Sequence, residues 1–374
     1  MGDGGAHFRG IRARRPVESI DVERDGARLA KSGFWVVLGE FDGPVRAWRM
    51  ADVERTAPVP EPPDPSRAWR GPSREEWESS LDRAAYVAGV GRIRDDIREG
   101  IVYQVNLCRV MSAPLTAASA TVGATNLRSD RGLGTPPDAV ALSRLLAVGN
   151  PARYAARVTL PAVGDAPPVW IVSASPELYL GVDGTAVTSS PIKGTAAPGV
   201  AMLDKDVAEN VMITDLVRND LSRVAMPGSV AVPELLGEHQ HPGLAHLQST
   251  VSATLAPDFD WTPRMWPALL GGTFPPGSVS GAPKSTALKI IAREEATPRG
   301  PYCGAIGWID ADARRAELAV GIRTFWWTPA RGGRLNFGTG AGITWGSDPA
   351  GEWDETELKA ARLIGLASGG TMVT

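Results

Sequence analysis

The sequence predicts an α+β protein, because its strand and helix signals are mixed without the regular alternation of a doubly wound parallel sheet. The hydrophobic fraction of 43% and the charged fraction of 22% are those of an ordinary folded protein of 374 residues. The 42 glycines and 31 prolines are many for a helical bundle and are typical of strands, turns and ligand-holding loops. We therefore expect strands and helices packed in layers around a sizeable core.

A β-hairpin is expected over residues 33–49, where aromatic and β-branched residues flank an Asp-Gly turn signal. The proline-rich, charged residues 56–74 are expected to form a surface connection. The chain thus divides into a strand-rich N-terminal portion, residues 1–75, and a larger portion, residues 76–374. We expect the two to form one compact unit.

Helix and strand signals follow along the larger portion. Residues 76–99 show helical periodicity that ends at a glycine. Residues 101–110 are a predicted strand in which Gln104 and Asn106 share one face. Residues 116–138 contain few large apolar side chains and are expected to loop outward. Further strands are expected at residues 169–176, 178–182, 186–190, 304–310, 316–326 and 335–344, and further helices at residues 204–223, 284–296 and 353–366.

The composition excludes several classes of protein. Lysine and arginine number 39 against 42 aspartates and glutamates, a net charge of −3, so no overall basic field is available to hold a nucleic acid. The two cysteines are too few for a disulfide framework or a four-thiolate zinc site. The first residues lack a secretory signal, and no run is apolar enough to span a bilayer. We expect a cytoplasmic protein that binds neither nucleic acid nor membrane.

Two acidic helix faces are candidates for a metal site. Asp206 and Glu209 are three residues apart in one predicted helix, and Glu352 and Glu355 are three apart near the last one, with Lys359 a turn further on. A carboxylate from each helix would suit Mg²⁺, which prefers oxygen ligands and leaves positions for water and an anionic substrate. The alternative, equally favoured by the spacing, is that these acids only offset the helix dipoles.

A second candidate combines an acid with an amine. Glu177 and Lys193 each follow a Ser-Pro pair closely, and the Asp183-Gly184 turn between them is expected to return Lys193 toward Glu177. An acid beside an amine suits proton donation next to a nucleophile. The spacing alone favours the simpler alternative of a cross-strand salt bridge.

Two loops expose backbone N–H groups that suit an anionic ligand. Residues 275–284 introduce a helix with small side chains, and residues 338–343 end a strand with three glycines. Neither loop has the spacing of a Walker motif or of a dinucleotide fingerprint.

Four motifs in order resemble those of the chorismate-utilising enzymes, the family of anthranilate synthase component I, aminodeoxychorismate synthase component I, isochorismate synthases and salicylate synthases. They are ENVMITDLVRND at 209–220, PPGSVSGAPK at 275–284, RGPYCGAIG at 299–307, and GAGI at 340–343 followed by SDPAGEWDET at 347–356. The resemblance covers about residues 76–366. It departs from the family at Ser280, where threonine is usual, and in residues 116–138, which look like an insertion.

The resemblance implies large β-sheets packed as a sandwich with helices outside, and a chorismate-binding catalytic domain over residues 76–374. It also implies a Mg²⁺ ion that binds the ring carboxylate of chorismate. Glu209 and Glu355 match its ligands, and Asp206 and Glu352 lie nearby and act through water.

The resemblance also implies roles for other residues. Glu177 matches the general acid that protonates the departing C4 hydroxyl, and His246 matches a histidine beside the ring. Arg323 and Tyr302 match residues that hold the enolpyruvyl carboxylate. The remaining expected substrate contacts are Thr195, Gly340 and Lys359.

Two positions separate the branches of the family. Members that add water have a lysine base where this chain has Gln104, and glutamine cannot take a proton from water. The segment Pro-Ile-Lys193-Gly-Thr resembles aminodeoxychorismate synthase, whereas anthranilate synthases have a small residue in place of the lysine. In that branch the lysine amine attacks C2 as the C4 hydroxyl leaves, and ammonia then attacks C4.

The resemblance therefore implies amination of chorismate at C4, with anthranilate synthase component I as the close alternative. A non-catalytic chorismate-binding subunit is a third hypothesis, and it is disfavoured because the matched positions are all filled. Neither Cys108 nor Cys303 lies in a credible nucleophile elbow, so the ammonia is expected from a separate glutamine amidotransferase subunit.

Overall fold

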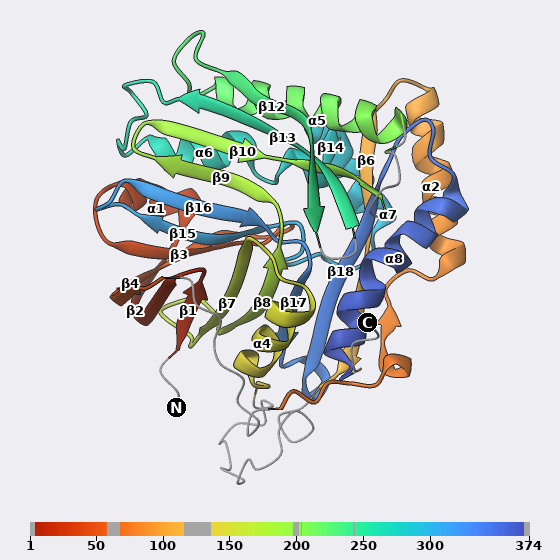
Figure 1. The fold of residues 1–374 in the computed structure, drawn as a ribbon, viewed down its shortest axis with the longest axis horizontal. Helices are drawn as coiled ribbons and strands as arrows, with labels where there is room; N and C mark the ends of the chain where they lie inside the picture. The colour runs from red at the N-terminus through yellow and green to blue at the C-terminus, as the bar shows by residue number, and fades with distance from the viewer. Residues whose placement is uncertain are drawn as a thin grey trace.

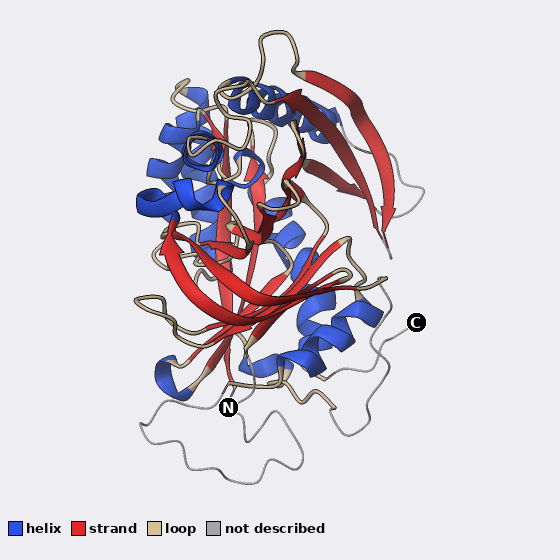
Figure 2. Ribbon diagram, turned by 90° about the vertical axis from the view of Figure 1, so that its left-hand side faces the viewer, coloured by secondary structure: helices blue, strands red, loops and turns tan. Residues whose placement is uncertain are grey.

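The computed structural model describes residues 4–57, 68–115, 136–196, 202, 204–241 and 244–369. It confirms the α+β class (Figure 1). The described strands are connected in one large antiparallel sheet that curls on itself, with helices on its outer faces (Figure 2). Most of the proline-rich connection and of the segment 116–138 lies outside the described residues.

The strands of this sheet are β1 (Gly5–Phe8), β2 (Ile11–Asp21), β3 (Phe34–Gly39), β4 (Val45–Arg55), β5 (Glu78–Ser79), β6 (Gln104–Pro114), β7 (Tyr154–Leu160), β8 (Val169–Ser175), β9 (Leu178–Asp183), β10 (Ala186–Ser190), β11 (Ile192–Ala196), β12 (Ala231–His241), β13 (Leu244–Thr254), β14 (Gly281–Ala282), β15 (Ala305–Asp310), β16 (Arg315–Val320), β17 (Thr324–Thr328) and β18 (Arg334–Ile343).

The described α-helices are α1 (Val22–Asp25), α2 (Arg83–Arg98), α4 (Ala139–Gly149), α5 (Asp204–Ser222), α6 (Met265–Thr273), α7 (Lys284–Glu294) and α8 (Pro349–Ala367). None of them is long and apolar enough to cross a membrane.

The predicted N-terminal hairpin is confirmed as β3 and β4. All six residues of β3 are buried, because this strand pairs on its other side with β15, far along the chain. Strand β1 likewise pairs with β7. The N-terminal strands are therefore part of the large sheet.

The long ladder between β6 and β18 is one wall of the site. It pairs Val105–Pro114 with Arg334–Ile343 and places Asn106 opposite Gly342 and Cys108 opposite Gly340. Three glycines in β18 leave this wall without side chains opposite Asn106, Cys108 and Val110 of β6. The loop motif 338–343 thus lies beside the face that Gln104 and Asn106 were expected to share.

Strands β9, β10, β11 and β13 form a second wall. The expected turn at Asp183-Gly184 joins β9 to β10, and β11 then pairs with β13 so that Lys193 lies opposite Leu247. A bulge between Lys193 and Thr195 contains Gly194, whose φ of 77° favours glycine.

The prediction of one strand over residues 316–326 is wrong. The segment forms β16 and β17, which pair with different strands. The break lies at Gly321, Ile322 and Arg323, and Arg323 has a left-handed φ of 52°. The bend turns the Arg323 side chain into the space between the two walls.

The predicted starts of two helices were also wrong. The helix predicted over residues 76–99 begins only at Arg83, because the Asp82 side chain caps it by accepting a hydrogen bond from the backbone N–H of Ala85. The last helix begins at Pro349, four residues early, with Asp348 as its cap, so that Glu352 lies in its first turn. Helix α8 packs on β18 and against α2, while α5 packs on β11 and β13 (Figure 1).

Candidate active site

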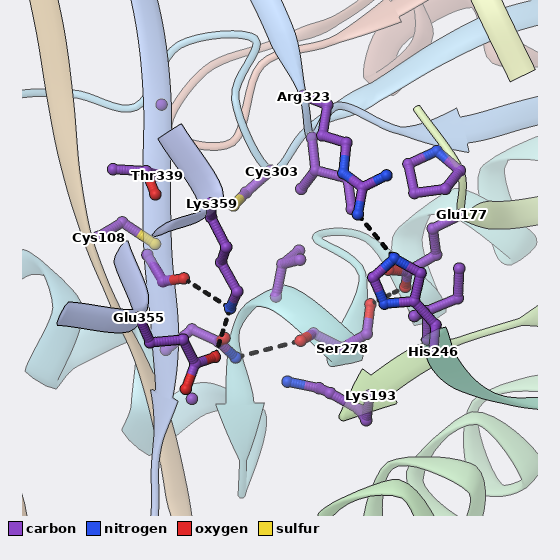
Figure 3. A pocket seen from close by; sticks show the side chains of 18 of the residues that line it. Cys108, Glu177, Lys193, His246, Ser278, Cys303, Arg323, Thr339, Glu355 and Lys359 are labelled. Atoms are coloured by element: carbon purple, nitrogen blue, oxygen red, sulfur yellow. Dashed lines mark hydrogen bonds and ion pairs between the residues drawn. The ribbon is translucent and has the colours of Figure 1, made fainter. Parts of the chain in front are cut away.

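One cavity of about 290 Å³ brings most of the predicted site residues together. Its walls come from β6, β18, β11 and β13, from the loop before α7, and from α5 and α8. Figure 3 shows Glu177, His246 and Arg323 on one side and Glu355 and Lys359 on the other. The sequence-predicted residues that line it are Glu177, Lys193, Asp206, Glu209, His246, Tyr302, Arg323, Gly340, Glu355 and Lys359.

Glu177 is held as a buried acid. Its side chain is 3% exposed. Burial raises its pKa to about 7, although several neighbouring groups act to lower the pKa. Ser278 Oγ donates a hydrogen bond to Glu177 Oε1 at 2.5 Å, and the nearby charges of Lys193 and Arg323 also lower the pKa. A carboxyl group in this environment is able to donate a proton near neutral pH.

Lys193 faces the same cavity but pairs with a different carboxylate than the one considered from the sequence. Its Nζ donates to Glu209 Oε1 at 2.7 Å, and the same oxygen accepts a hydrogen bond from Gln104 Nε2. The charge of Lys193 still reaches Glu177. An amine and a proton donor therefore share this part of the cavity.

Gln104 is fully buried behind Glu209, and its Oε1 has no hydrogen-bond partner among the described residues. The contact between Gln104 and Glu209 requires Gly342, since a Cβ at that position would lie 2.1 Å from Glu209 Oε1. The three-glycine end of β18 therefore makes room for side chains as well as exposing backbone.

Arg323 and His246 form a pair on the opposite wall. Arg323 Nη2 lies 2.8 Å from His246 Nε2, and His246 is 2% exposed. Burial lowers the pKa of Arg323 to about 10, although Glu177 opposes this shift. The guanidinium remains charged at neutral pH and faces a cavity that suits a carboxylate.

Tyr302 and Thr195 belong to different walls. The buried Tyr302 ring packs flat on β18, where a Cβ at Gly338 would lie 2.0 Å from the ring. Thr195 lies opposite His246 in the β11–β13 ladder, and its side chain lies outside the described residues.

The carboxylates on α5 and α8 form the candidate metal site. Asp206, Glu209 and Glu355 line the cavity, and Lys359 Nζ binds both Glu355 Oε1 at 2.7 Å and the Gly340 carbonyl at 3.1 Å. Glu352 is 2% exposed and lies behind this wall. Desolvation lowers the pKa of Lys359, but the charges of the three glutamates outweigh it and raise the pKa.

These residues fit a magnesium ion. Among the described residues, no group of three or more His, Cys, Asp or Glu side chains is close enough to enclose a metal. Mg²⁺ needs no such enclosure, because it is usually held by one or two carboxylates and keeps several waters or substrate oxygens. Glu209 and Glu355, one from each helix, supply that donor set.

Ser278 and Asn106 are site residues that the sequence did not single out for these contacts. Asn106 Nδ2 donates to the Ser278 carbonyl at 3.2 Å, and Ser278 in turn holds Glu177. The only sequence signals were the expected face shared by Gln104 and Asn106 and the anion-holding loop 275–284.

Comparisons with known proteins identify a family and similar enzymes. A family described as chorismate binding enzyme matches residues 38–365. The anthranilate synthase component 1 of Thermus thermophilus is 34% identical over 84% of this chain and 63% of its own length. The aminodeoxychorismate synthase of Streptomyces griseus is also 34% identical, over 88% of this chain and 43% of its own length.

A solved structure shares the fold. Anthranilate synthase component I of Streptococcus pneumoniae superposes with a TM-score of 0.73 at 23% identity, covering 96% of this chain and 92% of that one. The chain spans between 37% and 63% of the length of eight curated relatives that it matches.

Proposed function

Because this chain belongs to the chorismate-binding enzyme family, we propose that it is component I of an aminodeoxychorismate synthase, which aminates chorismate at C4. The observation that carries the proposal is the position of Lys193 in the cavity that also contains Glu177. Lys193 is the residue at which the C4-aminating branch differs from the anthranilate-forming one.

The proposed reaction has two displacements. The Lys193 amine forms a bond to C2 while the C4–O bond breaks, the double bond shifts, and Glu177 protonates the departing hydroxyl to give water. Ammonia then forms a bond to C4, the double bond returns, and the C2–N bond to Lys193 breaks. The product is 4-amino-4-deoxychorismate with the lysine regenerated.

The other cavity residues bind and orient the substrate. Arg323 and Tyr302 receive the enolpyruvyl carboxylate, and His246 lies beside the ring while holding Arg323. Mg²⁺ held by Glu209 and Glu355 would neutralise the ring carboxylate, with Asp206 and Glu352 nearby. Gln104 offers ammonia a buried acceptor, since its Oε1 has no partner among the described residues.

Anthranilate synthase component I is the second candidate, because the Thermus thermophilus relative of that name is as similar as the aminodeoxychorismate synthase relative. That enzyme class would place the amine at C2 and release pyruvate. A glutamine amidotransferase subunit is the proposed ammonia source in either case.

Substitution of Lys193 tests the proposal. Lys193→Ala is expected to lower C4 amination by about 100-fold or more while chorismate binding is largely retained, because a covalent step is lost. Lys193→Arg keeps the ion pair with Glu209 but is not a nucleophile, so it is expected to be nearly as inactive. Removing the lysine charge raises the pKa of Glu177 and keeps that acid protonated, so deprotonation of Glu177 cannot explain the loss.

Intact-protein mass spectrometry supplies the direct readout. Incubation with chorismate and Mg²⁺ in the absence of ammonia is expected to give an adduct of chorismate minus water on Lys193. Near-normal amination by both variants would contradict the covalent mechanism and would mean that Lys193 acts only through its charge.

A further inference from the structure

The two cysteines of the chain both line the cavity, although the proposed reaction uses neither. Cys108 comes from β6 and Cys303 from the loop before β15, and their side chains are 3% and 1% exposed. Both are free thiols. Figure 3 shows their sulfur atoms directed toward the same space near Lys359.

Both thiols are fixed by rigid surroundings. A Cβ at Gly340 would lie 2.4 Å from Cys108 Sγ, so this glycine provides the room that the thiol occupies. Cys303 has a left-handed φ of 63°, and its N–H donates to the Gly321 carbonyl at 3.0 Å. The Cys108 N–H donates to Glu295 Oε1 at 2.8 Å. Each cysteine is therefore held in place by the fold.

The environment makes the two sulfurs unequal. Burial raises the pKa of Cys303, but the neighbouring Cys108 side chain, the charge of Arg299 and the Tyr302 side chain outweigh it, even against Glu295, and lower the pKa. Burial and the neighbouring Cys303 side chain raise the pKa of Cys108 well above its usual value. A more acidic sulfur beside a less acidic one is the arrangement of a nucleophile and a resolving thiol.

We propose that Cys108 and Cys303 form a peroxide-sensitive dithiol in the wall of the substrate cavity, which oxidises to an intramolecular disulfide and closes the site. The Cys303 thiolate attacks a peroxide oxygen, breaks the O–O bond and becomes a sulfenic acid, while the leaving hydroxide takes up a proton to give water. The Cys108 sulfur then attacks the sulfenic sulfur, forms the S–S bond and releases a second water. Two thiols are thus oxidised by one peroxide, which is reduced to two waters.

The disulfide would reshape the cavity. Bonded sulfurs are about 2 Å apart, so the loop that carries Cys303 and the strand that carries Cys108 must approach each other. Tyr302 precedes Cys303 in that loop and Gly340 lies opposite Cys108, and both are proposed substrate contacts. Oxidation is therefore expected to abolish substrate turnover, and thiol reductants are expected to restore it.

Hydrogen peroxide treatment of the full-length chain tests the proposal. After free thiols are alkylated, peptide mass spectrometry is expected to show one disulfide that joins Cys108 to Cys303 and is lost on reduction. Recovery of both cysteines as free alkylated thiols, or only as separate sulfinic and sulfonic acids, would overturn the proposal.

Single variants assign the two roles. Cys108→Ser is expected to leave a Cys303 sulfenic acid that dimedone traps, whereas Cys303→Ser is expected to leave Cys108 unreactive toward peroxide. Equal reactivity of the two sulfurs in these variants would contradict the assignment. The mass readout does not depend on activity. If the disulfide forms at the same rate with and without chorismate, the result supports this inference. It then counts against the binding of chorismate in the cavity, which the proposed function requires.

Discussion

At the scale of single residues, burial decides what Glu177 is able to do. The carboxyl group lies between two cations and a hydroxyl that all favour its charged form, yet removal from water outweighs them and raises its pKa to about 7. A general acid must be protonated to act, so the rate of the C4–O cleavage step is expected to fall as the pH rises through about 7.

Ser278 allows this assignment to be tested. Its hydroxyl stabilises the Glu177 carboxylate, so Ser278→Ala is expected to raise the pKa of Glu177 and to move the falling limb of the pH–rate profile to higher pH. Ser280→Ala is the matched control, because Ser280 Oγ donates to the Pro276 carbonyl instead. If the falling limb of the profile moves equally in both variants, or in neither, Glu177 is not the general acid.

At the scale of elements, two helices far apart in the sequence, α5 and α8, face the cavity with carboxylates. Helix α5 supplies Asp206 and Glu209, and α8 supplies Glu355 with Lys359 one turn later. Lys193 forms an ion pair with Glu209, and Lys359 forms one with Glu355. These lysines balance negative charge that a bound cation would also neutralise. Without a cation, the ring carboxylate of the substrate would meet these glutamates at close range.

Removal of the metal is therefore expected to stop turnover, and added Mg²⁺ to restore it. Glu355→Gln is expected to raise the Mg²⁺ concentration needed for half-maximal rate by about tenfold or more. Asp354→Asn removes an exposed charge from the same helix and is the control, with little expected effect. Titrations of rate against Mg²⁺ measure both variants, and full activity in excess chelator would contradict the metal assignment.

Local patterns in the sequence predicted many elements but not the contacts between them. The N-terminal hairpin, α5 and β18 were predicted closely, because turn residues and periodicity are local signals. The strand expected over residues 316–326 was wrong, since apolar continuity does not reveal a bend such as that at Arg323. Strands β1, β2, β7, β12 and β13 and helices α4 and α6 were not predicted.

The candidate site shows the same division between local and distant information. The resemblance pointed to ten residues that the structure places along the cavity, while the partners of individual side chains depended on the tertiary fold. Glu177 meets Ser278 across 101 positions, and Gln104 meets Glu209 across 105. No periodicity in a single sequence encodes such pairings, which is why Lys193 was considered with Glu177 and is found on Glu209.

At the scale of the whole molecule, the proposed amination needs ammonia, and neither of the two cysteines is placed to act as the nucleophile of a glutaminase. Both are buried along the cavity, Cys108 on β6 and Cys303 in the loop before β15. The purified chain is therefore expected to turn over chorismate with an ammonium salt and to show negligible activity with glutamine until an amidotransferase subunit is added. Unaided release of glutamate from glutamine would contradict this division of labour.

The most direct test of the proposed function is the identity of the product made from chorismate, Mg²⁺ and an ammonium salt. Mass spectrometry and absence of anthranilate fluorescence are expected to show 4-amino-4-deoxychorismate, in which the enolpyruvyl group is retained. Formation of fluorescent anthranilate with release of pyruvate would contradict C4 amination and assign the chain to the anthranilate-forming branch.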